Sequence, residues 1–265
     1  MLPLVVAILL QTRFAAPDAG LATAALASPR PRDCRGAAGD GLWSRLRGAD
    51  AQHYCDLLAR GYARLQQTPS EALVAAQAAQ ALAGALPAVR VLTGRAELRL
   101  GQSASAFEQF ALADAQDAQA FAPPKALHDY ARAASLAGKS AESLRLYRLL
   151  VSRAALLDDA REATFVQIEA AAHVLAYAPA GIDEALGYLT QARRESLGLS
   201  AWIEGLRLVA LQRGGRAEPR TSKAELPSPA ALSAPNADIP LLPPGVLEAL
   251  RAALAEPAPR RVKAR

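Results

Sequence analysis

The chain has 265 residues and a net charge of +5, and its residues are 52% hydrophobic but only 5% aromatic. Alanine and leucine supply most of the apolar side chains, which favours closely packed helices over a β-sandwich built from β-branched and aromatic residues. The arginines are scattered along the chain. The sequence contains neither the Cys/His spacing of a zinc finger nor a basic stretch interleaved with aromatic residues, so binding to nucleic acid is not expected.

Residues 1–27 resemble a secretory signal peptide. The apolar run at 1–10 is too short to span a bilayer, and a stretch of small residues follows it around 21–28. No Lys or Arg precedes the apolar run, and Arg13 and Asp18 interrupt the residues behind it, so a cytoplasmic protein with an irregular N-terminus is the alternative. We expect an exported protein, periplasmic or secreted, that has no membrane-spanning helix.

Residues 28–49 form a lead-in rich in Pro, Gly and charge, which is predicted to be extended apart from a brief helix at 42–47. Cys34 and Cys55 are the two cysteines of the chain. A small, even number of cysteines in an exported protein predicts one disulfide, which would contribute roughly 3 kcal/mol by restricting the unfolded chain. Two unrelated buried thiols are the alternative. A metal site is not expected, because His53 is the one histidine nearby.

Residues 50–213 carry apolar side chains at helical spacing, with breaks at Pro or Gly every 15–20 residues. The pattern predicts short helices, with antiparallel neighbours, at 50–66, 70–84, 87–100, 103–117, 124–137, 140–155, 158–177, 181–196 and 198–213. At the start of the second helix, Thr68 and Pro69 with Glu71 are typical of a capped N-terminus.

Acidic and aromatic residues in this region are interpreted as structural. The acidic cluster opens the helix at 158–177, where carboxylates favour the helix dipole, and consists of Asp158, Asp159 and Glu162. The aromatic residues predicted to pack between helical hairpins are Phe121, Tyr130, Tyr147 and Phe165.

After residue 213 the sequence changes character. Residues 214–245 carry many prolines and few large apolar side chains, which predicts a linker with little packed structure. Residues 246–265 comprise an amphipathic helix, to about residue 256, and a basic tail. The helix is expected to cap the apolar end of the helical region at Trp202, Leu206 and Val209. Docking on a partner or on a membrane surface is the alternative.

An internal repeat is visible when the turn glycines are aligned. Two units show the same spacing of small and aromatic residues. The first contains Gly94, Gly101, Ala106, Phe110 and Ala113, and the second contains Ala131, Gly138, Ser143, Tyr147 and Leu150. This pattern is similar to the tetratricopeptide repeat, in which small residues stand where two helices cross and an aromatic residue faces the next unit. Gly101 and Gly138 lie 37 positions apart, against about 34 in the family, and the family's early tryptophan is missing.

The resemblance covers residues 50–213 and is clearest over 87–155. It implies an all-α fold, a right-handed α-α superhelix of about four antiparallel hairpins. The composition predicts disordered segments at both ends. The resemblance also places the first helix of each hairpin along a concave groove. The cationic residues that it assigns to this groove are Arg95, Arg99, Lys125, His128 and Arg132. They are expected to converge and to bind an acidic or C-terminal carboxylate segment of a protein partner, unless they are merely solvated.

Catalysis is not expected. His53, His128 and His173 are far apart, and the chain contains neither an H-E-x-x-H nor a G-x-S-x-G motif. The sequence therefore predicts a non-enzymatic protein–protein interaction scaffold of the cell envelope, without catalytic residues, cofactor or metal. An enzyme of unrecognised type with an all-helical active site, and a cytoplasmic adaptor built from the same repeats, are the alternatives.

Overall fold

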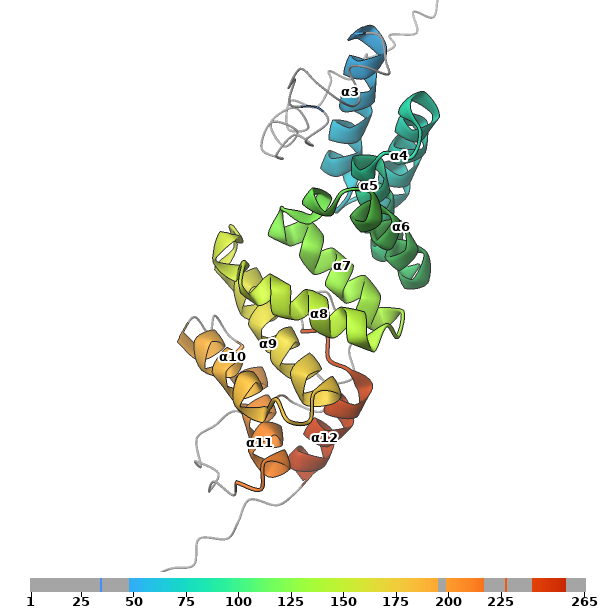
Figure 1. Ribbon diagram of the computed structural model, residues 1–265. Coiled ribbons are helices and arrows are strands. Elements are labelled where there is room, and N and C mark those ends of the chain that lie inside the picture. Colours follow the sequence, from blue (N-terminus) through green and yellow to red (C-terminus); the bar gives the residue numbers. More distant parts are fainter. Residues whose placement is uncertain (1–33, 35–47, 195–198, 217–226, 228–239, 256–265) are drawn as a thin grey trace, which may run out of the picture.

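The computed structural model describes Cys34, residues 48–194, residues 199–216, Pro227 and residues 240–255. The predicted signal peptide, the helix at 42–47, most of the linker and the basic tail lie outside these residues. All regular secondary structure in the described part of the chain is helical, as Figure 1 shows. The predicted all-α class is therefore confirmed.

Each helix predicted between residues 50 and 213 is present, as is the last one, with boundaries that differ from the prediction by a few residues. The helices are α3 (Gly48–Arg64), α4 (Pro69–Ala83), α5 (Pro87–Arg99), α6 (Ser103–Gln116), α7 (Pro124–Leu136), α8 (Ser140–Val151), α9 (Ala160–Tyr177), α10 (Ile182–Arg194), α11 (Ser200–Arg213) and α12 (Pro244–Ala255). Two short 3-10 turns that the sequence did not predict are η2 (Ala118–Phe121) and η3 (Ala154–Leu156).

From α3 to α12, each helix packs against its neighbours in sequence (Figure 1). In addition, α5 contacts both α3 and α7, and α9 contacts α11. The first helices of successive pairs therefore lie near one another. Side chains on the same side of these first helices can form a single surface.

The predicted disulfide is present and joins Cys34 to Cys55 of α3, with their Cα atoms 5.7 Å apart. Cys34 is buried in the apolar cluster of the first hairpin, which also contains Tyr54 and Leu58 of α3. The bridge therefore fixes a point of the lead-in segment to the first helix.

Glycines end the helices at two of the predicted turns. Gly101 and Gly138 adopt φ values of 78° and 71°, a left-handed conformation that costs glycine little. Beyond them, the Gln102 N–H donates to the Glu97 carbonyl at 2.9 Å and the Lys139 N–H donates to the Ala134 carbonyl at 2.8 Å. This bonding satisfies carbonyls that a helix end leaves free.

The start of α4 differs from its prediction. The helix begins at Pro69, as expected, but the Thr68 side chain makes no capping hydrogen bond. The carboxylate of Glu71 lies 3.2 Å from the Arg64 guanidinium of the preceding helix. The predicted cap by these side chains is therefore wrong, and Glu71 pairs with Arg64 of α3 instead.

Residues 240–255 return to the helical array. Val246, Leu250 and Ala253 of α12 are buried in one apolar cluster with residues of α11 that include Trp202, Leu206 and Val209. The expectation that the last helix covers this end is confirmed. Within the described residues, no helix is both long enough and apolar enough to cross a bilayer.

A close helix crossing inside the second hairpin depends on Gly94. A Cβ atom added there would lie 2.8 Å from Cε1 of the Phe110 ring and 3.1 Å from the Ala106 carbonyl oxygen. Because Phe110 is fully buried, its ring has little room to move. This is the position at which the repeat pattern predicts a small residue.

We predict that Gly94→Ala destabilises the protein by about 1–3 kcal/mol, because the methyl group overpacks the crossing. Gly187→Ala in α10 is the matched control, since a Cβ there has no neighbour within 4 Å. This change should stabilise the helix by up to about 1 kcal/mol through helix propensity. Urea unfolding of both variants measures the difference, and equal gains in stability would contradict the close crossing.

Candidate functional site

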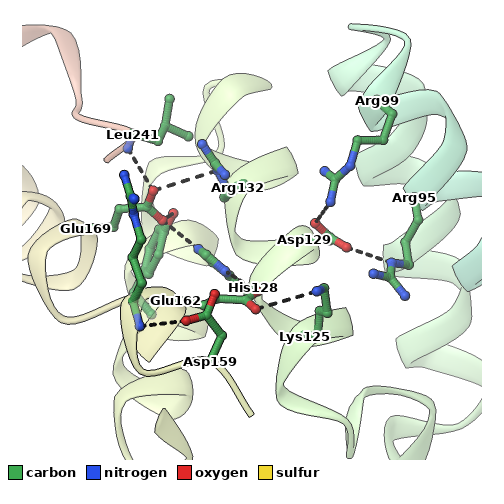
Figure 2. Close-up of polar contacts among 12 residues, drawn as sticks. Arg95, Arg99, Lys125, His128, Asp129, Arg132, Asp159, Glu162, Glu169 and Leu241 are labelled. Atoms are coloured by element: carbon green, nitrogen blue, oxygen red, sulfur yellow. Dashed lines mark hydrogen bonds and ion pairs between the residues drawn. The ribbon is translucent and has the colours of Figure 1, made fainter. Parts of the chain in front are cut away.

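The five cationic residues assigned to one surface do come together (Figure 2). Arg95 and Arg99 lie one helical turn apart on α5, and Lys125, His128 and Arg132 follow the same spacing along α7. Residues three or four positions apart share one face of a helix. Because α5 packs against α7, the two sets meet.

Three carboxylates meet the cations, and sequence reasoning missed all of them as partners. They are Asp129 of α7 and Glu162 and Glu169 of α9 (Figure 2). These eight residues are called the ionic cluster below. With His128 protonated, five cations face three carboxylates, which leaves a net charge of +2.

Asp129 joins the second hairpin to the third. Its Oδ2 accepts from Arg95 Nε at 2.6 Å and its Oδ1 accepts from Arg99 Nη2 at 3.2 Å. Burial alone would raise the pKa of Asp129, but the two guanidinium groups hold it below its ordinary value. The Arg95 guanidinium also lies 5.7 Å from the centre of the Tyr62 ring of α3. Arg95 is therefore fixed by neighbours on two other helices.

Glu169 is the most deeply buried member of the cluster, with a side chain only 1% exposed. Its Oε2 accepts from His128 Nε2 at 2.7 Å and from the Tyr147 hydroxyl at 2.8 Å. Its Oε1 accepts from the Leu241 N–H at 2.7 Å and lies 3.7 Å from Arg132 Nε. Burial disfavours the carboxylate, but these cations and donors outweigh it and lower the pKa of Glu169 to about 2.

His128 bridges two carboxylates. Its Nε2 contacts Glu169 at 2.7 Å, and its Nδ1 lies 3.3 Å from Glu162 Oε1. Only the imidazolium can donate from both ring nitrogens. Burial lowers the pKa of His128, but Glu169 and Glu162 more than compensate and raise it to about 9. His128 is therefore charged at neutral pH.

His173 behaves in the opposite way. Its Nδ1 donates to the Glu169 main-chain carbonyl at 2.7 Å, and its Nε2 accepts from the Ser135 hydroxyl at 2.8 Å. Burial lowers its pKa, so this ring stays neutral. It packs 4.3 Å from the ring of Tyr147, which is fully buried. Tyr147 is thus a packing residue, as predicted, and it also donates a hydrogen bond to Glu169.

The acidic residues at the start of α9 divide into two roles. The Asp159 side chain accepts from the Arg161 N–H at 2.8 Å and so caps the helix, at the end where the dipole argument places carboxylates. Glu162 instead reaches α7, where it contacts His128 and lies 3.6 Å from Lys125 Nζ. Glu162 is therefore part of the ionic cluster in addition to lying in the first turn of α9.

Accessibility differs sharply within the cluster. Side-chain exposure is 54% for Lys125, 28% for Arg99 and 24% for Arg132, but 11% for Arg95 and 5% for His128. Lys125 and Arg99 can therefore meet an incoming anion, while the buried cations hold the helices together. In the described part of the chain, no group of three His, Cys, Asp or Glu residues is arranged to hold a metal ion.

Comparisons with family models, characterised proteins and solved structures find no match to this chain. Functional interpretation therefore depends on the residues and their geometry.

We predict that stability falls as pH rises from about 6.5 to about 9. The folded-state pKa of His128 is raised, so its contribution is complete below the unfolded value of 6.5 and disappears as pH passes the folded value of about 9. The loss should be roughly 3 kcal/mol. Burial lowers the folded-state pKa of His173, so this group makes a small opposite contribution near pH 6.5, where its unfolded form deprotonates, and almost none above about pH 7.5.

The measurement is urea unfolding of the full chain at several pH values between 6.5 and 9. His128→Gln should remove most of the pH dependence, while His53→Gln, at an exposed position of α3, should leave it unchanged. An equally steep fall in the His128→Gln variant would show that another group is responsible.

Proposed function

We propose that this chain is a non-enzymatic protein–protein interaction scaffold of the cell envelope, periplasmic or secreted. In this proposal the helices form a tetratricopeptide-like superhelix, whose first helices bind an acidic segment of a peptide or protein partner. The close crossing at Gly94 and the left-handed turns at Gly101 and Gly138 support the repeat assignment.

The observation that carries the binding role is the excess positive charge of the ionic cluster. Lys125 is half exposed, and its ammonium group lies 3.6 Å from Glu162, a longer distance than the 2.6 Å between Arg95 and Asp129. A partner carboxylate can therefore pair with Lys125 without breaking the buried contacts. Charge-assisted hydrogen bonds of this kind orient acidic peptides.

The disulfide supports the envelope location. A bond between Cys34 and Cys55 persists in oxidising compartments and is rare in the cytoplasm, where thiols are kept reduced. This favours export over the alternative of a cytoplasmic adaptor.

The burial of His128 and Glu169, and of Tyr147 beside them, favours binding over catalysis. His128, Tyr147 and Glu169 carry titratable groups with shifted pKa values, which is a feature of many active sites. Each of these residues is at most 4% exposed, and they bind one another. A catalytic group must reach its substrate, so their arrangement is better explained as support for the surface.

The test uses a labelled acidic decapeptide with a free C-terminal carboxylate and the full-length chain at low ionic strength. We predict that the peptide binds and that Lys125→Glu weakens binding about tenfold or more. Lys139→Glu is the matched control, because Lys139 is exposed beyond the opposite end of α7, about 20 Å away along the helix. Fluorescence anisotropy reports both affinities.

Raising the salt concentration should weaken binding to the wild-type chain, since the contact is between exposed charges. Equal weakening by the two variants, or preference for a basic peptide of the same length, would contradict the assignment of the surface.

A further inference from the structure

A segment of the chain itself occupies one end of the surface that bears the ionic cluster. Residues 240–243 contact α9, and α12 follows them directly and packs against α11 and α9 (Figure 1). Pro240 and Pro243 are buried, and Leu241 donates its N–H to Glu169 (Figure 2). This 16-residue stretch, 240–255, is called the C-terminal strap.

Two polar contacts of the strap are made to its main chain. Glu169 Oε1 accepts from the Leu241 N–H at 2.7 Å. Arg213 of α11 donates to the Gly245 carbonyl at 3.4 Å, and it also donates to the Leu175 carbonyl at the end of α9. Main-chain groups are common to all peptides, so these contacts select the path of a segment and not its side chains.

The apolar contacts of the strap come from one side of a helix. Val246, Leu250 and Ala253 are buried at spacings of four and three residues. Gly205 of α11 leaves a notch for Leu250, because a Cβ atom at position 205 would lie 2.7 Å from Leu250 Cδ1. An amphipathic helix that lies in an apolar groove is recognised in this way.

Release of the strap would leave the ionic cluster paired. The contacts of Glu169 Oε2 with His128 and Tyr147 do not involve the strap, and Arg132 lies beside the Oε1 atom that Leu241 would vacate. Twelve residues, 228–239, connect the strap to Pro227, which is buried beside Gly205 of α11, so a released strap stays attached to the array.

We propose that the α9–α11 end of the array is a second docking site, for a partner segment built like the strap. Such a segment has an extended stretch with a free main-chain N–H and continues as an amphipathic helix with apolar residues at positions i, i+4 and i+7. The chain's own strap occupies the site until the partner segment displaces it. This inference goes beyond the acidic-peptide surface at Lys125, and either one can fail without the other.

The test measures binding of a labelled peptide with the sequence of residues 240–255 to the full-length chain. A tethered segment competes at an effective concentration on the order of millimolar, so a micromolar peptide should bind the wild-type chain weakly. Leu250→Glu should undock the resident strap and tighten peptide binding at least about tenfold. Ala252→Glu adds the same charge on the exposed side of α12 and should behave like the wild type.

A second peptide identifies the contact at Glu169. Methylation of the main-chain nitrogen of Leu241 removes its N–H, and this peptide should bind the Leu250→Glu chain about tenfold more weakly than the unmodified one. If the unmodified peptide binds the Leu250→Glu chain no better than the wild-type chain, or if methylation has no effect, the proposal is overturned.

If Leu250→Glu does not fold, hydrogen exchange on the wild-type chain tests whether the strap opens by itself. The amides of Leu241 and of α12 should exchange faster than those of residues 166–175 in α9, through an opening that leaves α9 protected. Exchange of both regions at the same rate would show that the strap opens only when the whole array unfolds, which overturns the proposal.

Discussion

The buried carboxylate of Glu169 is the interaction on which the arrangement of the C-terminal half depends. A charge that is 1% exposed is tolerated only when donors and cations surround it. Here those groups come from α7, α8 and the C-terminal strap, through His128, Tyr147 and Leu241. A slip of α7 or α8 by one residue would remove the His128 or Tyr147 donor and weaken this compensation. Glu169 therefore favours one register of the hairpins over others.

Apolar packing and the ionic cluster have different tasks. Inside a hairpin, small residues such as Gly94 allow two helices to approach, and the aromatic ring of Phe110 fills the remaining space. Between hairpins, Asp129 connects α5 to α7, and Glu169 connects α7 to α9. The cations of the cluster therefore differ in role: Arg95 and His128 are buried and hold carboxylates, while Lys125 at the edge is half exposed. A rigid interior with an accessible rim suits a binding surface, since little ordering is needed when a ligand arrives.

Much of the fold was predictable, because proline and glycine mark the helix ends and the turn glycines recur. The convergence of the five cations was expected from the tetratricopeptide resemblance, which places the first helix of each hairpin along one surface. Their carboxylate partners were not, since contacts such as Arg95 to Asp129 and His128 to Glu169 span 34 and 41 residues and depend on how one hairpin rotates against the next. One signal was present: between Glu162 and Asp183, Glu169 is the only Asp, Glu, Lys or Arg in a largely apolar helix. Glu169 and Leu241 are 72 residues apart in the sequence and are separated by a proline-rich stretch, so no local pattern indicates their contact.

The most direct test of this account is an NMR titration of the His128 imidazole in the full-length protein, followed through its ring nitrogen shifts. The account predicts a pKa of about 9, with protons on both ring nitrogens at neutral pH, because Glu162 and Glu169 each accept one hydrogen bond. A pKa at or below 6.5, or a neutral ring with one proton at pH 7, would contradict it. Either result would mean that the ionic cluster does not hold the helices together.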